Sequence, residues 1–156
     1  MKTKNITAII IAVAIFIIVV LILGQMFSKN MITYANKNNN FKINYPKDWT
    51  YNEGQEFNYA FHVFFSKGTA QFGVLPKGEV DRGLQLGEPI KKEIIINNQK
   101  AIRKDWTLDN GNFLIIINFL DYPATWNENN RLDITGEQKD VKIFEKMIKS
   151  FKFELN

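Results

Sequence analysis

The pattern of apolar and polar positions divides the chain into two parts. The first part holds an uncharged run of eighteen residues, Ile6 to Leu23, which is apolar except for the hydroxyl of Thr7 and has Lys2 and Lys4 before it. As a helix rising about 1.5 Å per residue, the run would be about 27 Å long, close to the thickness of a bilayer core. Gly24 and the residues after it lack the small-x-small exit of a cleaved signal peptide. We therefore expect residues 1–24 to be a retained single-pass transmembrane helix, rather than a cleaved leader or a buried core helix.

Positive charges around this run predict its orientation. Lys2, Lys4 and the N-terminal amine lie close to one end, whereas Lys29 and Lys37 lie farther from the other end. Because short positive flanks stay in the cytoplasm, we expect the N-terminus inside and the C-terminal domain outside the cell membrane. The chain has no Cys that could carry a lipid, so its contact with the lipid bilayer would be the helix itself.

The second part begins after an Asn-rich stretch. Asn36 and Asn38 to Asn40 have side chains that favour turns over helix interiors. We interpret residues 25–40 as a polar spacer and expect the folded part to begin near Phe41. Residues 41–156 are enough for one domain with its own core.

Much of this domain has the alternation that is typical of strands. Strands are expected at Phe41–Tyr45, Tyr59–Ser66 and Ala70–Leu75, and a hairpin is expected where Glu93–Ile96 turns at Asn97-Asn98-Gln99. We therefore expect a largely antiparallel sheet.

The dipeptide Asn110-Gly111 predicts a further hairpin with a two-residue type I′ turn. With Asp109 opposite Asn112, alternation puts seven apolar side chains on the core face: Ile102, Trp106, Leu108, Phe113, Ile115, Ile117 and Phe119. Arg103, Asp105 and Thr107 are then expected on the opposite, partly wet face.

The C-terminal region predicts a helix. Thr135 and Gln138 have capping-box spacing, and apolar residues then recur at steps of three and four: Val141, Phe144, Met147, Ile148 and Phe151. This indicates an amphipathic helix of about fourteen residues on the sheet. The alternation from Phe151 to Leu155 indicates a final edge strand. The predicted fold class is α+β, an antiparallel sheet covered by one or more helices.

Three segments resemble PsbP-like proteins, the superfamily that includes an extrinsic subunit of the oxygen-evolving photosystem. Phe41 to Trp49, FKINYPKDW, resembles the family's opening F-x-I-x-Y-P-x-x-W. Ile94 to Ala101 resembles its strand, turn and x-K-A return, and Phe144 to Phe153 resembles its closing helix and S-F-x-F strand. The resemblance covers residues 41–156. It implies a central antiparallel sheet between helices in a non-enzymatic accessory protein at a membrane surface, and it carries over no functional residue.

Charge and the side-chain inventory limit the chemistry. Residues 41–156 hold 16 basic and 16 acidic side chains, so this domain lacks the basic surface of nucleic-acid-binding proteins. A triad of His62 with Ser66 or Ser150 is not expected, because Ser66 lies about 13 Å along the same strand and Ser150 ends a helix. The sequence around His62 has no metal-ligand spacing, and the glycines match no phosphate-binding loop. We therefore expect no catalytic site, no metal and no cofactor.

The loop from Asp121 to Glu128 is the candidate interaction site. Its two large aromatic residues, Tyr122 and Trp126, are expected either to contact a partner or to close the end of the core. Only the first alternative gives the loop a function.

These observations leave three functions. The expected one is a membrane-anchored, non-enzymatic, extracytoplasmic domain that binds or helps assemble another envelope component, with an envelope protein as partner and no nucleic acid. The alternatives are a small-ligand or lipid carrier with a pocket between sheet and helix, and a pilin-like envelope subunit. A pilin has Gly before its apolar run, whereas Gly24 follows the run in this chain.

Overall fold

The computed structural model describes residues 13, 15, 16, 30–56, 59–76, 86–127 and 130–154. The chain forms two compact units, Met1–Met31 and Ile32–Asn156. In the first unit, residues 13, 15 and 16 are helical with exposed side chains. The rest of the predicted anchor, residues 1–24, lies outside the described residues. The described part of the chain contains no helix that is long and apolar enough to cross a membrane.

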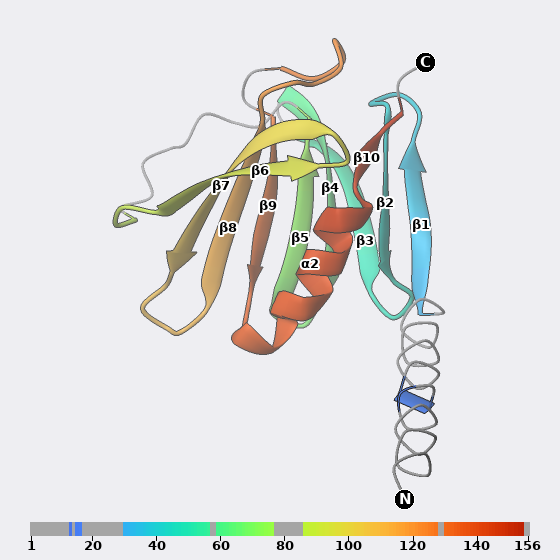
Figure 1. Cartoon of the computed structure of the whole chain (residues 1–156). Helices are drawn as coiled ribbons and strands as arrows, with labels where there is room; N and C mark the ends of the chain where they lie inside the picture. The colour runs from blue at the N-terminus through green and yellow to red at the C-terminus, as the bar shows by residue number, and fades with distance from the viewer. Residues whose placement is uncertain are drawn as a thin grey trace, which may run out of the picture. The chain divides into compact units, whose positions relative to one another are not determined.

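The second unit contains two antiparallel sheets and a helix in its described part (Figure 1). The strands are β1 (Met31–Asn36), β2 (Phe41–Pro46), β3 (Thr50–Glu56), β4 (Tyr59–Lys67), β5 (Ala70–Leu75), β6 (Ile90–Ile96), β7 (Gln99–Thr107), β8 (Phe113–Phe119), β9 (Arg131–Gly136) and β10 (Lys152–Phe153). The helix is α2 (Val141–Ser150). The larger sheet has the strand order β3-β4-β5-β9-β8-β7-β6, and the smaller sheet has the order β1-β2-β10. Together with α2 they form an α+β fold, which is the fold class that the sequence predicts.

The core lies between α2 and one face of the seven-stranded sheet. The apolar stripe of the helix is buried as predicted, at Phe144, Met147 and Ile148. The Phe144 ring contacts those of Trp49, Phe72 and Phe113. A buried aromatic ring of this kind contributes a large apolar area to the core. We call the opposite face of this sheet the outer face.

The start of the helix differs from the prediction. Thr135 belongs to β9, and a 3-10 turn, Gln138–Asp140, precedes α2. The capping interaction lies two residues later than expected, because the Glu137 N–H donates to Asp140 Oδ2 at 3.0 Å. The predicted final edge strand is confirmed as β10, which pairs with β2.

The β7–β8 turn also differs from the prediction, and the difference shifts the register by one residue. The Leu108 N–H donates to the Asn112 carbonyl at 2.8 Å, and the Gly111 N–H donates to the Leu108 carbonyl at 2.9 Å. Gly111 has φ of +79°, whereas Asn110 is not among the described residues with positive φ. This is a three-residue loop with a bulge at Gly111, rather than the two-residue type I′ turn.

The corrected register moves every β7 side chain to the other face. Arg103 is opposite Ile117 and Asp105 is opposite Ile115, so both lie on the helix face rather than the wet face. Arg103 Nη1 donates to Glu145 Oε1 of α2 at 2.6 Å, which joins sheet and helix. Ile102 and Trp106 lie on the outer face instead. The core positions predicted on β8, from Phe113 to Phe119, are on the helix face as expected.

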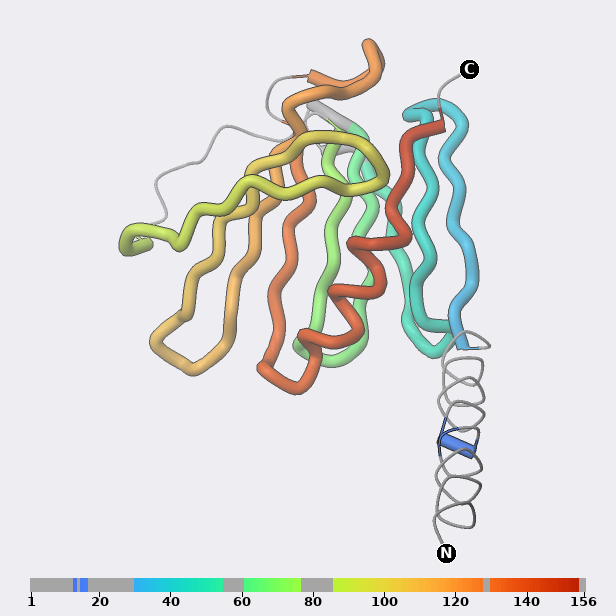
Figure 2. The backbone as a smooth tube through the Cα atoms, viewed as in Figure 1, coloured from blue at the N-terminus to red at the C-terminus, as the bar shows by residue number. Residues whose placement is uncertain are grey.

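The type I′ geometry occurs in the other predicted hairpin. Asn97 and Asn98 have φ of +46° and +69°, and Ile96 is opposite Gln99. Asn97 Nδ2 also donates to the carbonyls of Lys149 (3.1 Å) and Phe151 at the end of α2. Figure 2 shows this hairpin crossing toward the end of the helix. The tip of the β6–β7 hairpin is therefore held in place by the helix.

The predicted spacer, residues 25–40, is partly a strand. β1 borders β2, and Tyr34 is only 8% exposed. Its ring contacts those of Phe41, Tyr51 and Phe65. The folded part therefore includes β1 and does not begin at Phe41. β3 and β9 are two further strands that the sequence did not predict.

Candidate functional site

The structure separates the two aromatic residues of the candidate loop. Trp126 is 4% exposed, and its indole Nε1–H donates to the Asn39 carbonyl at 2.7 Å. Its ring contacts those of Phe41, Phe151 and Phe153. Trp126 thus closes the end of the core, and its suggested role as an exposed partner-binding residue is corrected. Tyr122 is 38% exposed and remains a candidate.

Two further exposed apolar residues lie on the outer face near this loop. Ile95 is opposite Lys100 in the β6–β7 ladder. The Leu120 N–H donates to the Lys100 carbonyl at 2.8 Å, which continues the β7–β8 register by one pair. Ile95, Lys100 and Leu120 therefore form one cross-strand row. Ile95 is 73% exposed and Leu120 is 51% exposed. Ile95 and Leu120 lie on either side of Lys100, and Tyr122 follows Leu120 by two residues in the chain. We call these three exposed apolar or aromatic residues the apolar patch.

The sequence contains a signal for part of this patch in three consecutive isoleucines. Ile94, Ile95 and Ile96 are consecutive, so strand alternation forces at least one of them away from the core. Ile96 is buried and Ile95 is exposed. Leu120 lies in the same cross-strand row as Ile95 only in the observed β7–β8 register. The predicted two-residue turn shifts that register by one residue.

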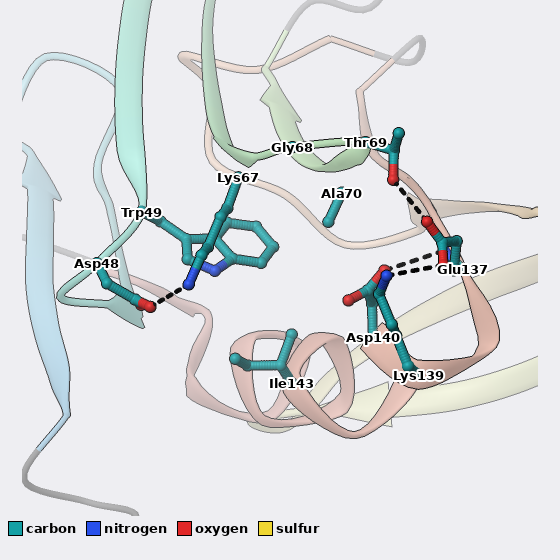
Figure 3. Close-up of a pocket in the computed structure, with 10 residues that line it drawn as sticks. All are labelled: Asp48, Trp49, Lys67, Gly68, Thr69, Ala70, Glu137, Lys139, Asp140 and Ile143. Carbon is teal, nitrogen blue, oxygen red and sulfur yellow. Dashed lines mark hydrogen bonds and ion pairs between the residues drawn. The ribbon is translucent and has the colours of Figure 1, made fainter.

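A hollow of about 650 Å³ lies at the other end of the strands, beside the start of α2 (Figure 3). Trp49, Ala70 and Ile143 supply apolar lining. Five charged side chains also line the hollow: Asp48, Lys67, Glu137, Lys139 and Asp140. Lys67 pairs with Asp48, and Lys139 Nζ lies 2.8 Å from Glu137 Oε2. These four charged side chains are thus paired within the protein.

Three charged groups of this hollow, Asp48, Glu137 and Lys139, have pKa values shifted away from neutral pH. The hydrogen bond from Lys67 holds the pKa of the Asp48 carboxyl below its usual range. Hydrogen bonds from Lys139 and Thr69 lower the pKa of Glu137, and Glu137 in turn raises the pKa of Lys139. A general acid or base works best with a pKa near the working pH. These shifts move both carboxyls and the amine away from that range.

Of the side chains considered for catalysis, His62 and Ser150 lie on opposite sides of the sheet, and Ser66 lies four residues along β4 from His62 on the same face. Val63 and Val74 form a buried pair, so the neighbouring His62 lies on the outer face. Ser150 lies on α2, on the other side of the sheet, and its Oγ donates to the Met147 carbonyl at 2.8 Å and accepts from the Asn44 N–H at 2.9 Å. No group of three potential metal-ligating residues occurs within the part of the chain that the structure describes.

Comparison with known proteins adds no assignment to this geometry. No family model matches the chain, and no curated protein matches it. The class that the fold and surfaces define is an α+β domain with an extended antiparallel sheet and an exposed apolar patch.

Proposed function

We propose that this chain is a single-pass, membrane-anchored, non-enzymatic protein whose extracytoplasmic domain binds or helps assemble another envelope component. The observation that carries the proposal is the apolar patch. Three of the six exposed large apolar or aromatic side chains described in the second unit belong to it: Ile95, Leu120 and Tyr122. Grouped exposed apolar residues mark interaction sites, whereas single ones need no explanation.

The site chemistry supports binding over catalysis. In the hollow beside α2, ion pairs join Lys67 to Asp48 and Lys139 to Glu137, and the lowered pKa values of both carboxyls move their titration farther below neutral pH. The carrier alternative has less support, because the fully buried side chains of Phe72, Phe144 and Met147 fill the centre of the region between α2 and the sheet. The hollow at the start of α2 is lined by five charged side chains. The pilin-like alternative depends on residues 1–24, which lie largely outside the described part.

A PsbP-like relationship remains part of the proposal. The three resembling segments correspond to β2 with the turn that follows it, the β6–β7 hairpin, and α2 with β10. They occur in the order that the resemblance requires. The resemblance implies a fold, and a shared fold does not transfer a function.

Site-specific photocrosslinking in native membranes tests the proposal. A photoreactive amino acid at Tyr122 of the full chain should give an adduct with one envelope protein, and Leu120→Asp should abolish that adduct. Tyr51 is an exposed aromatic residue on β3, the opposite edge strand, and serves as the matched control position. No adduct from position 122, or the same adducts from both positions, would contradict the proposal.

A further inference from the structure

The free edge of β6 is a second surface beside the apolar patch. β6 ends the order of the seven-stranded sheet and pairs with β7, with no second neighbour among the described strands. An open edge presents backbone N–H and C=O groups to which another strand can bond.

The hairpin register identifies which groups are open. In a hairpin with a two-residue turn, Ile96 and Gln99 exchange both hydrogen bonds, and bonded pairs then alternate along the ladder. The bond from the Leu120 N–H to the Lys100 carbonyl agrees with this, because it directs the Lys100 backbone toward β8 and away from Ile95. The backbone groups of Lys91, Glu93 and Ile95 therefore point to the free edge.

The hairpin that carries this edge is basic, although residues 41–156 are neutral as a whole. Between Ile90 and Thr107 the chain has five basic side chains and two acidic ones. Arg103 forms ion pairs with Asp105 and Glu145, and Lys92 Nζ lies 3.7 Å from Asp105 Oδ2. Lys91 and Lys100 are exposed. The edge therefore presents a positive field to an approaching segment.

We propose that β6 binds an extended, acidic segment of another protein as an added antiparallel strand. The proposal rests on the proposed function, since it names the binding mode of the same domain. Two carboxylates opposite Lys91 and Lys92, with apolar residues opposite Ile94 and Ile95, complement this edge.

A second copy of this chain is a poorer occupant of the edge. Antiparallel pairing of β6 with its own copy about Glu93 puts two glutamates directly opposite. Pairing about Lys92 puts two lysines opposite and each Lys91 opposite a Glu93. Like charges in directly opposed positions destabilise a strand pair. A segment with carboxylates opposite both Lys91 and Lys92 places no like charges opposite each other and complements the edge better than a second copy does.

Fluorescence anisotropy with a designed probe tests the inference on the full chain in detergent. The probe is a labelled peptide, Val-Val-Val-Thr-Glu-Glu-Val, written in the direction antiparallel to β6. It should bind, while the peptide with Lys in place of both Glu should not. A version N-methylated at the amides that face β6 should also fail, because it cannot form the strand ladder.

Variants of the edge separate backbone pairing from charge. Glu93→Pro removes an open N–H without removing a β6–β7 bond, and it should weaken probe binding about tenfold or more. Glu93→Gln, the matched control, removes the same charge, retains the N–H and should bind at least as well as the parent. Lys91→Glu combined with Lys92→Glu should reverse the preference toward the Lys-containing peptide, and thermal melting checks that each variant is folded.

Each outcome decides the inference. Equal binding of the N-methylated probe, unchanged binding by folded Glu93→Pro, or no binding of the acidic probe would overturn strand addition at β6. An adduct at Tyr122 with no probe binding would leave the proposed function standing and reject this mode of recognition. Probe binding without an adduct at Tyr122 would reject the proposed function and leave strand addition at β6 standing.

Discussion

Gly111 is the residue on which the geometry of the β7–β8 loop depends. Its φ of +79° lies in the region that β-branched residues avoid. Gly111→Val should therefore reduce the free energy of unfolding by about 1–3 kcal/mol, measured by urea denaturation. Asp109→Ala, in the same loop, should change it by less than about 0.5 kcal/mol. Equal stability of Gly111→Val and the parent would reject the loop geometry.

The Asp48–Lys67 pair makes a prediction about pH. The carboxyl pKa is lowered in the folded state, so its contribution to stability is present above the unfolded pKa and is lost as pH falls through the lower folded value. Lys67→Gln should raise the pKa of Asp48 toward its ordinary value, measured by NMR titration of the carboxyl carbon. Lys152→Gln, at the other end of the strands, should leave it unchanged. An unaltered Asp48 pKa in Lys67→Gln would show that the pair does not form in solution.

At the residue scale, the sequence could not distinguish Tyr122 from Trp126. Both are large aromatic residues in one loop with similar neighbours. The buried Trp126 indole donates its hydrogen bond to Asn39, which lies 87 positions earlier in the chain. A partner that distant leaves no local pattern, and only the fold reveals it.

At the scale of elements, apolar periodicity predicted the parts that face the core. The strands near Phe41, Tyr59 and Ala70 and the buried stripe of α2 follow from alternation and from steps of three and four. β3, with sequence TYNEGQE, lacks that alternation. The register of β7 was wrong because Asn-Gly is compatible with both two-residue and three-residue loops, which differ by one position.

β1 makes a prediction about where the domain begins. A fragment starting at Asn30 should have a higher melting temperature than one starting at Asn38, because the latter loses the buried Tyr34 ring. Tyr34→Ala in the longer fragment should cost on the order of 3 kcal/mol. Tyr122→Ala is the control, since that ring is partly exposed and outside β1. Equal melting temperatures of the two fragments would show that β1 contributes nothing to the fold.

At the scale of the whole molecule, the proposed topology predicts accessibility. With the N-terminus inside, protease added to intact spheroplasts should remove the domain from Ile32 onward, detected by immunoblotting with an antibody against the C-terminal residues. A cytoplasmic marker protein should stay intact in the same sample. Protection of the domain until lysis would place it in the cytoplasm and reject the localisation.

The pairing of β2 with β10 has a consequence for biosynthesis. Phe41 is opposite Phe153, so the small sheet joins the first predicted strand of the domain to the last few residues of the chain. A contact of such long sequence separation forms late and slows folding. The small sheet therefore cannot be completed until Phe153 has left the ribosome. In a chain that is secreted during translation, Phe41 would cross the membrane before Phe153 is available, and the β2–β10 pairing would form on the far side.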